Sequence, residues 1–388
     1  MVSYIIRTRN RPHRVQRLLR DIARTHADAG VCEVIIVDDA SQQRLVCPAR
    51  LRNGFPVRSV WTTLREGWAS LNAGAATCDG GSAWLVFLQD QACPVSGECA
   101  AWLDDWDSSV VAVAPDVFID ARGRRAARRV SACLPEVLPT CAFAVRREAF
   151  MAAGGFARDL SGPAAVLDLC ARLLGARTGA PRARATSQIQ KTPPRIVFDP
   201  RWMVARRASA EGTVSHASLL RQLRDYSYVL ACNAPEGARS ELLHFLDDVA
   251  PCRGNAARRA LAKVLREART MPLGGGPARV WERLTGLTAV RESLGREHAR
   301  SPFRTATLVD AGRHAWVVER ALAELGVRIV DFTSRPDVQV VGTLAPAPML
   351  RSMFRRTPRL QGPRVLAPWT PPLPPVPAAT TPRPAVAA

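Results

Sequence analysis

Residues 2–41 read VSYIIRTRNRPHRVQRLLRDIARTHADAGVCEVIIVDDAS, and this stretch decides the fold. Residues 2–6 and 34–37 are short apolar runs, rich in β-branched residues and bounded by polar ones, which predicts two buried strands. Between them, apolar residues recur at helical spacing after Pro12, a residue that a first helical turn tolerates. A strand, a helix and a strand within about forty residues form a βαβ unit, whose strands are parallel and adjacent.

Polar residues follow both predicted strands. Thr8, Arg9 and Asn10 come after the first strand, and Asp38 and Asp39 come after the second. Ligands of such sheets bind outside the carboxyl ends of the strands, so these residues form the first candidate binding site. The alternative is a generic doubly wound domain whose strand ends are merely polar.

The stretch resembles the opening of the family 2 glycosyltransferases of the GT-A fold, which reads roughly VSVIIPTYNR and then EVIVVDDGS. The family's proline and aromatic residue on either side of the threonine are Arg7 and Arg9 here. In that family this loop and the aspartate pair bind the nucleotide of a sugar nucleotide. The resemblance therefore implies a nucleotide site, since carboxylates accept base N–H or ribose hydroxyl groups. The matching residues are Ser3, Ile5, Ile6, Thr8, Asn10, Arg11, Glu33, Val34, Asp38, Asp39 and Ser41.

Two later stretches resemble the same family in the same order along the chain. Residues 64–91 contain Asn72 and Gly74 at the positions of its NxG motif, which adds Asn72 to the nucleotide-site candidates. Residues 140–173 resemble its acceptor-side segment. The likeness covers roughly residues 2–207, so we expect a GT-A domain over 1–207, with a mixed, mostly parallel sheet flanked by helices.

The position of the family's D-x-D metal motif reads Gln89-Asp90-Gln91 here. In the family this motif binds Mn²⁺ or Mg²⁺, hard cations that prefer oxygen ligands, and the metal bridges the two phosphates. Asp90 is therefore a candidate metal ligand and diphosphate contact, although one carboxylate predicts only weak metal binding. The alternative is that Asp90 caps a turn at the strand end.

The family's general base also lacks a counterpart in this chain. Aligning Asp168 with the family's helix motif places Ala165 and Val166 at the positions of its Glu-Asp pair. Neither side chain can accept a proton from an acceptor hydroxyl. Asp168 and Asp159 are the nearest carboxylates in sequence, and we take them as candidate catalytic residues.

Composition limits the range of partners. The formal net charge is +20, and all but Lys191 and Lys263 of the 54 basic residues are arginines. Such a field attracts nucleotide diphosphates, acidic polymers or an anionic membrane surface, but it is equally typical of a GC-rich bacterial genome. No specific nucleic-acid partner is expected, because the arginines are interspersed and only three tyrosines are present.

The ten cysteines are scattered and form no C-x-x-C pair, which indicates reduced thiols. No secretory leader or uncharged apolar stretch of membrane-spanning length is evident. We therefore expect a cytoplasmic protein, with peripheral contact at the inner face of the membrane as a further expectation from the resemblance.

Beyond residue 207 the pattern changes twice. Residues 208–300 show helical periodicity, and the glycine cluster at 272–277 is a linker because no Gly-Lys-Ser/Thr follows it. Residues 301–365 predict a small, partial Rossmann-like α/β module without G-x-G-x-x-G. Residues 366–388 predict a proline-rich disordered tail.

Two functions of different class remain open. The first is transfer of a sugar from a nucleotide-diphosphate donor to a hydroxyl acceptor in a polysaccharide, lipid or natural product. The second is a catalytically degenerate relative that binds a glycan, a nucleotide or a protein. A third, weaker hypothesis is a basic protein associated with nucleic acid.

Overall fold

A computed structural model gives the structure of the chain. It describes residues 1–25, 31–95, 102–120, 128–129, 134–175, 192–207, 215–249, 255–312, 314–344, 349, 352–353 and 363–369. The predicted proline-rich tail lies outside these residues from position 370 onward.

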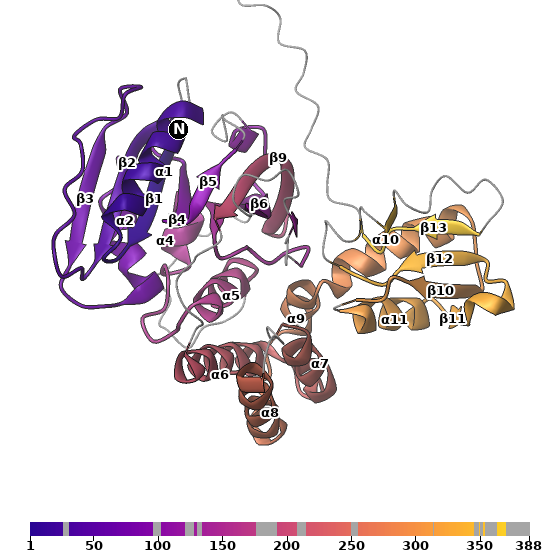
Figure 1. Ribbon diagram of the computed structural model, residues 1–388. Coiled ribbons are helices and arrows are strands. Elements are labelled where there is room, and N and C mark those ends of the chain that lie inside the picture. Colours follow the sequence, from indigo (N-terminus) through magenta and orange to yellow (C-terminus); the bar gives the residue numbers. More distant parts are fainter. Residues whose placement is uncertain are drawn as a thin grey trace, which may run out of the picture.

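A large mixed sheet forms the N-terminal part (Figure 1). Within the described ranges its strands run in the order β3-β2-β1-β4-β8-β6-β9-β5, and β7 pairs with β6. Strand β1 pairs in parallel with both β2 and β4, which confirms the predicted βαβ unit. The strands are β1 (Val2–Thr8), β2 (Val31–Asp39), β3 (Val57–Thr62), β4 (Trp84–Gln89), β5 (Ala92–Pro94), β6 (Val110–Asp120), β7 (Arg128–Arg129), β8 (Ala142–Arg146) and β9 (Arg195–Arg207).

Helices cover both faces of this sheet. Tyr4 and Ile6 of β1 pack into one apolar cluster with Leu18 of α1 (Pro12–Thr25). Ile5 points the other way and packs with Phe87 in a second cluster. This alternation follows from the two-residue period of side chains along a strand. Short segments on the second face are η1 (Gly67–Ser70), α2 (Leu71–Ala76), α4 (Arg147–Ala152) and α5 (Pro163–Leu173).

Helix α2 lies unusually close to the sheet because of Gly74. A Cβ atom at this position would lie 2.7 Å from Val37 Cγ2 and 2.8 Å from Ile5 Cγ2. Both distances are shorter than real carbon contacts, so a larger residue would push α2 away from β1 and β2. Gly74 thereby sets the position of the segment that leads into the candidate site.

Replacing Gly74 with alanine should therefore lower the free energy of unfolding by about 1–3 kcal/mol, because the added methyl group overpacks the core. The matched control is Gly295→Ala on α10 (Leu287–Arg300), where a Cβ atom meets nothing within 4 Å. The control should be neutral or stabilising by up to about 1 kcal/mol. Denaturant unfolding followed by circular dichroism checks both, and equal midpoints for the two variants would contradict the packing argument.

The middle of the chain is helical, as the periodicity predicted. Its helices are α6 (His216–Asn233), α7 (Arg239–Val249), α8 (Asn255–Thr270), α9 (Ala278–Thr285) and α10. They join the N-terminal part through Arg283 of α9, whose Nε lies 2.7 Å from Glu136 Oε2, and through Asp225 of α6, which accepts a hydrogen bond from the Ser161 backbone at 3.0 Å. The helical part is thus tied to the large sheet by polar contacts as well as by a shared apolar cluster.

The glycine cluster between α8 and α9 packs against the end of α6. Gly274 N donates to Ala231 O at 2.9 Å, and Gly276 N donates to Ala234 O at 3.3 Å. A Cβ atom on either glycine would collide with the backbone of Cys232 or Asn233. These glycines therefore allow close backbone approach, which agrees with the prediction of a linker.

A second, smaller sheet contains the C-terminal strands in the order β11-β10-β12-β13, with every pair parallel. Its elements are β10 (Thr305–Val309), α11 (Ala315–Glu324), β11 (Arg328–Ile329), η2 (Phe332–Ser334), β12 (Val338–Val341) and β13 (Arg364–Leu366). Leu366 and Trp369, which the sequence analysis assigned to the tail, are buried, and Trp369 Nε1 donates to Leu344 O at 2.9 Å.

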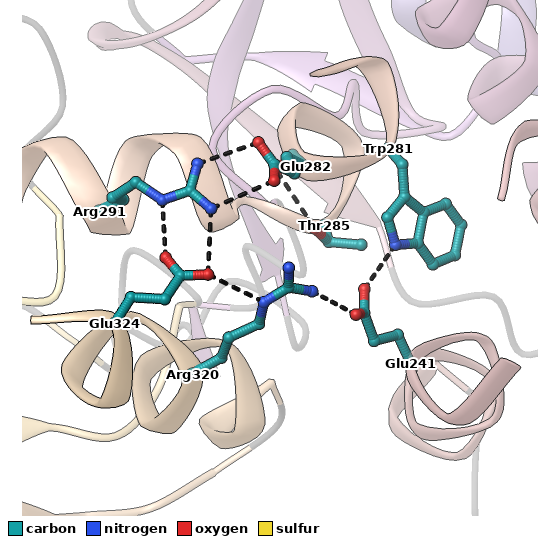
Figure 2. A network of polar contacts seen from close by, with 7 residues as sticks. All are labelled: Glu241, Trp281, Glu282, Thr285, Arg291, Arg320 and Glu324. Atoms are coloured by element: carbon teal, nitrogen blue, oxygen red, sulfur yellow. Dashed lines mark hydrogen bonds and ion pairs between the residues drawn. The ribbon is translucent and has the colours of Figure 1, made fainter. Parts of the chain in front are cut away.

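An ion-pair network joins this module to the helical part (Figure 2). Arg291 of α10 pairs with Glu282 of α9 at 3.0 Å and with Glu324 of α11 at 2.7 Å. Arg320 of α11 links Glu324 to Glu241 of α7. Single exposed pairs contribute little, but bidentate pairs that share partners hold their helices in one geometry.

Among the described helices, none combines the length and the apolar character needed to cross a bilayer. The described cysteines Cys78, Cys141 and Cys170 are free and buried. Burial raises the pKa of Cys141 and of Cys170 to about 12, so both thiols stay protonated and act as small core residues.

Candidate functional site

The candidate site lies at the carboxyl ends of β1, β2 and β4. Thr8 is in register with Asp38, and Arg7 is in register with Gln89, so the three strand ends meet at one edge. A cavity of about 470 Å³ opens there. Its lining residues are Arg7, Thr8, Arg9, Asn10, Arg11, Asp39, Arg65, Gln89, Asp90 and Gln91.

Asp38 is buried behind the cavity and shapes the loop after β2. Its Oδ1 accepts from Ser41 N at 3.2 Å, and its Oδ2 accepts from Leu45 N at 3.1 Å. Both carboxylate oxygens therefore accept hydrogen bonds from the backbone of the chain. The structure does not bring Asp38 into the cavity lining with the other predicted nucleotide-site residues.

Asp39 lines the cavity, but its oxygens are also engaged. Arg7 Nη1 lies 3.0 Å from Oδ2, and the backbone N–H groups of Glu66 and Gly67 donate to Oδ1 and Oδ2 at 3.0 and 3.2 Å. Gly67 has φ of +62°, a left-handed conformation that glycine adopts without strain. Asp39 thus connects the loop after β3 to the end of β1, and a nucleoside at this position would have to share its oxygens with these donors.

Asn10 connects the loop after β1 to the loop after β2. Its backbone N–H donates to Ser41 Oγ at 2.8 Å, and its Oδ1 accepts from Gln42 N at 2.8 Å. Asn10 has φ of +52°, a region in which asparagine is tolerated better than most residues. The two loops that the resemblance assigns to the nucleotide are therefore held together by this residue.

Asp90 lies at the floor of the cavity among positive charges. Thr8 Oγ1 donates to Oδ2 at 3.3 Å, and guanidinium nitrogens of Arg11 and Arg14 lie 3.7 and 3.9 Å from Oδ1. Burial raises the pKa of Asp90, and the neighbouring arginines oppose that effect. The surroundings of Asp90 thus resemble an anion site with one internal carboxylate.

These residues do not fit the divalent metal that the family motif implies. Asp90 is flanked by two amides, and its nearest charged partners are arginines rather than further carboxylates. Within the described ranges, no group of three or more histidine, cysteine, aspartate or glutamate side chains is placed to hold a metal ion. A cation bound at Asp90 would lie beside two guanidinium groups that repel it.

Asn72 positions the acceptor-side loop and lies outside the cavity lining. Its Nδ2 donates to Phe156 O at 2.9 Å, and its Oδ1 accepts from Phe156 N at 2.8 Å. A Cβ atom on Gly155 would lie 2.5 Å from Asn72 Oδ1, and Gly155 has φ of +69°, so only glycine fits there. The family motifs around Asn72 and Gly155 therefore form one contact between two distant segments.

Asp168 is engaged in an ion pair within α5. Its Oδ2 accepts from Arg172 Nε at 2.9 Å and Nη2 at 2.6 Å, and Arg172 also donates to Gly155 O at 2.6 Å. Ala165 and Val166, at the positions of the family's base pair, are buried in the core. Asp168 thus orients an arginine that holds the acceptor-side loop.

Asp159 is exposed on the acceptor-side loop and is not among the cavity-lining residues. The loop approaches the cavity rim where Arg158 Nε lies 3.9 Å from Glu66 Oε1. Glu66 follows the lining residue Arg65, and sequence reasoning missed both. Both residues belong to the LREG stretch at 64–67, but only the folded structure shows that this stretch contacts Asp39.

Two substitutions test, through the free energy of unfolding, whether Asp168 has a structural role that Asp159 lacks. Asp168→Asn removes the charge that pairs with the mostly buried Arg172, and we expect a loss of about 1–3 kcal/mol in the free energy of unfolding. Asp159→Asn changes an exposed side chain and should alter stability by less than about 0.5 kcal/mol. Thermal and denaturant unfolding of both variants measure this difference, and an unchanged Asp168→Asn would show that the ion pair is not structural.

The C-terminal module offers a second place for a nucleotide, but its helix start is already occupied. The backbone N–H of His314, at the start of α11, donates to Asp248 Oδ2 of α7 at 2.7 Å, and Trp316 Nε1 donates to the same oxygen at 3.2 Å. Phosphate groups bind at helix starts of this kind, and here a carboxylate of the chain takes that position. A cavity of about 450 Å³ beside β10 and β11 has Asp331 as its one charged lining residue.

Comparison with known proteins gives one family match, in the N-terminal part. The model of "Glycosyl transferase family 2" matches residues 3–150. This range contains every lining residue of the N-terminal cavity and ends before Asp159 and Asp168. A search among curated proteins found no significant match.

Several solved structures are similar to this chain at low identity. GalNAc-T7 with UDP, GalNAc and Mn²⁺ has a TM-score of 0.48 and 14% identity over 78% of this chain. This chain spans 58% of the length of that protein. The Pyrobaculum calidifontis mannosyltransferase PcManGT with GDP-Man and Mn²⁺ has a TM-score of 0.45 and 17% identity, and the match covers 84% of this chain and 86% of PcManGT. S. aureus TarS 1–349 with UDP has a TM-score of 0.45 and 12% identity, and the match covers 78% of this chain and 87% of TarS 1–349.

Proposed function

We propose that this protein, whose N-terminal part has the GT-A fold and matches the model of glycosyltransferase family 2 over residues 3–150, transfers a sugar from a nucleotide-diphosphate donor to a hydroxyl acceptor. The donor would occupy the cavity at the ends of β1, β2 and β4, and the acceptor would approach over the loop from Gly155 to Asp159. The acceptor belongs to the class of polysaccharides, lipids or natural products.

The observation that carries the proposal is the cavity at the ends of the parallel strands. Its volume of about 470 Å³ lies within the range of small-molecule sites, and its lining is almost entirely polar. The position, outside the carboxyl ends of parallel strands, is where ligands of such sheets bind. Arg9, Asn10 and Asp39 line it together, as a site for a charged nucleotide requires.

The acceptor side rests on how the 155–159 loop is anchored. Asn72 binds both polar backbone atoms of Phe156, and Arg172 binds Gly155 O. The ring of Phe156 packs on Phe87 and Phe150, with centroids 5.3 Å apart in each pair. Fixed backbone on one side of the cavity is what positioning of a second substrate needs, because orientation supplies a large part of rate enhancement.

In the reaction, the acceptor hydroxyl oxygen bonds to the anomeric carbon while the bond from that carbon to the donor phosphate breaks. The electron pair of the broken bond stays on the departing diphosphate, and the hydroxyl proton passes to a base. Asp168 is committed to Arg172, so we assign the base role to Asp159, which is exposed on the acceptor loop. Glu66, whose side chain is one-quarter exposed, is an alternative carboxylate near this rim.

The rival function is a non-catalytic relative that binds a nucleotide or a glycan. It is favoured by the burial of Ala165 and Val166, which leaves α5 without a base at the family's position. General-base assistance is worth about a hundredfold to ten-thousandfold, so its loss slows a transferase without abolishing it. The two functions therefore differ in turnover, and donor binding alone does not separate them.

The test measures release of nucleoside diphosphate by the purified full chain from a panel of nucleotide sugars, with cell extract as the acceptor source. We expect turnover with at least one donor and a loss of about a hundredfold or more in kcat for Asp159→Asn. Asp104→Asn, an exposed carboxylate outside the cavity lining, is the matched control and should keep full activity.

The possible outcomes test the identity of the base and the transfer of sugar separately. A loss confined to Glu66→Gln would move the base assignment to Glu66 while leaving sugar transfer intact. Absence of turnover with every donor, together with tight nucleotide binding, would favour the non-catalytic rival.

A further inference from the structure

The cavity carries a concentration of arginines that a metal-dependent donor site would not need. Four of its ten lining residues are arginines, against the two carboxylates of Asp39 and Asp90. Arg14 adds a further guanidinium group 3.9 Å from Asp90. Positive charge thus exceeds negative charge at the position where the family motif places a cation.

The local sequence explains how these arginines converge. Arg7, Arg9 and Arg11 alternate along the end of β1 and the loop after it, and Arg14 lies three residues beyond Arg11 on α1. Arg11 directly precedes the first helical residue and Arg14 lies in the first turn of α1, and both approach Asp90. The first turn of α1 also starts at this rim, and its positive dipole end favours an anion.

The arginines differ in the carboxylates that they face. Arg7 pairs with Asp39 at 3.0 Å. Arg11 and Arg14 face Asp90, with guanidinium nitrogens 3.7 and 3.9 Å from its Oδ1. Arg9 Nε is buried and has no hydrogen-bond partner among the described residues, although a buried N–H normally has one.

We propose that the donor diphosphate binds directly to the guanidinium groups of Arg9 and Arg11, which line the cavity, and that Asp90 orients Arg11 and Arg14 instead of ligating a metal. The proposal rests on the proposed function for the identity of the ligand as a nucleoside diphosphate. A guanidinium group is planar and always charged, and it donates two parallel hydrogen bonds to phosphate oxygens.

The balance of charge favours this arrangement over a metal. A divalent cation at Asp90 would gain one carboxylate and face repulsion from Arg11 and Arg14 at short range. A diphosphate in the cavity is attracted by four lining arginines and repelled by two lining carboxylates, those of Asp39 and Asp90. The same groups would stabilise the negative charge that develops on the diphosphate when the sugar bond breaks, which is the role a bridging metal otherwise has.

Calorimetry of the full chain with UDP and GDP tests the proposal. We expect the same dissociation constant, within about twofold, in EDTA and in MnCl₂. Arg9→Gln and Arg11→Gln should each weaken binding by about tenfold to a hundredfold, the range for loss of a charge-assisted hydrogen bond. Arg17→Gln is the matched control, since it removes the same charge from an exposed position on α1, and it should leave binding unchanged.

The effect of Asp90→Asn on diphosphate binding has a different sign for an arginine site and for a metal site. An orienting carboxylate competes with phosphate, so its neutralisation should preserve or strengthen diphosphate binding. A metal ligand should lose binding on the same change, and loss in Asp90→Asn together with abolition by EDTA would overturn the proposal.

Inorganic pyrophosphate distinguishes failure of this inference from failure of the proposed function. Pyrophosphate binding that weakens in Arg11→Gln, without binding of either nucleotide, would support the arginine site and contradict the nucleotide-sugar function. Nucleotide binding unaffected by both Arg9→Gln and Arg11→Gln would overturn the arginine site and leave the function standing. Absence of binding by all three ligands would overturn both.

Discussion

The parallel pairing of β1 with β2 on one side and β4 on the other is the constraint on which the rest of the structure depends. It brings three loops that are far apart in the sequence to one edge of the sheet. Apolar residues on both faces of these strands fix the register, since a shift by one residue would turn each buried side chain to the opposite face. The cavity follows from this register and from the close approach of α2 at Gly74.

The acidic and basic side chains at that edge of the sheet have different roles. Asp38 and Asp39 accept hydrogen bonds from backbone N–H groups of the loops after β2 and β3. The cavity lining contains four arginines and the carboxylates of Asp39 and Asp90. On the acceptor side, Asp168 is likewise engaged, through Arg172. These aspartates thus act as internal supports of the loops, while the arginines make the cavity lining basic.

Much of the N-terminal fold could be predicted from the sequence because its signals are local. The apolar runs around Ile5 and Ile35 and the helical spacing of Leu18 gave the βαβ unit, and the order of the motifs predicted the GT-A sheet. The roles of individual polar residues could not be predicted, because they depend on contacts between distant segments. Asn72 is predicted as a nucleotide-site residue, and the structure shows that its side chain binds the backbone of Phe156, 84 positions along the chain. The rim position of Glu66 likewise depends on backbone bonding to Asp39, which no local pattern reveals.

Hydrogen–deuterium exchange of the full chain, with and without a saturating nucleoside diphosphate in EDTA, tests most directly that the ends of β1, β2 and β4 form the donor site. The account predicts slower exchange of backbone amides in residues 8–11, 65 and 89–91, where the loops line the cavity. The turn at 310–312 should not change, because Asp248 already occupies the start of α11. Protection confined to that turn, with unchanged exchange around the N-terminal cavity, would contradict the account.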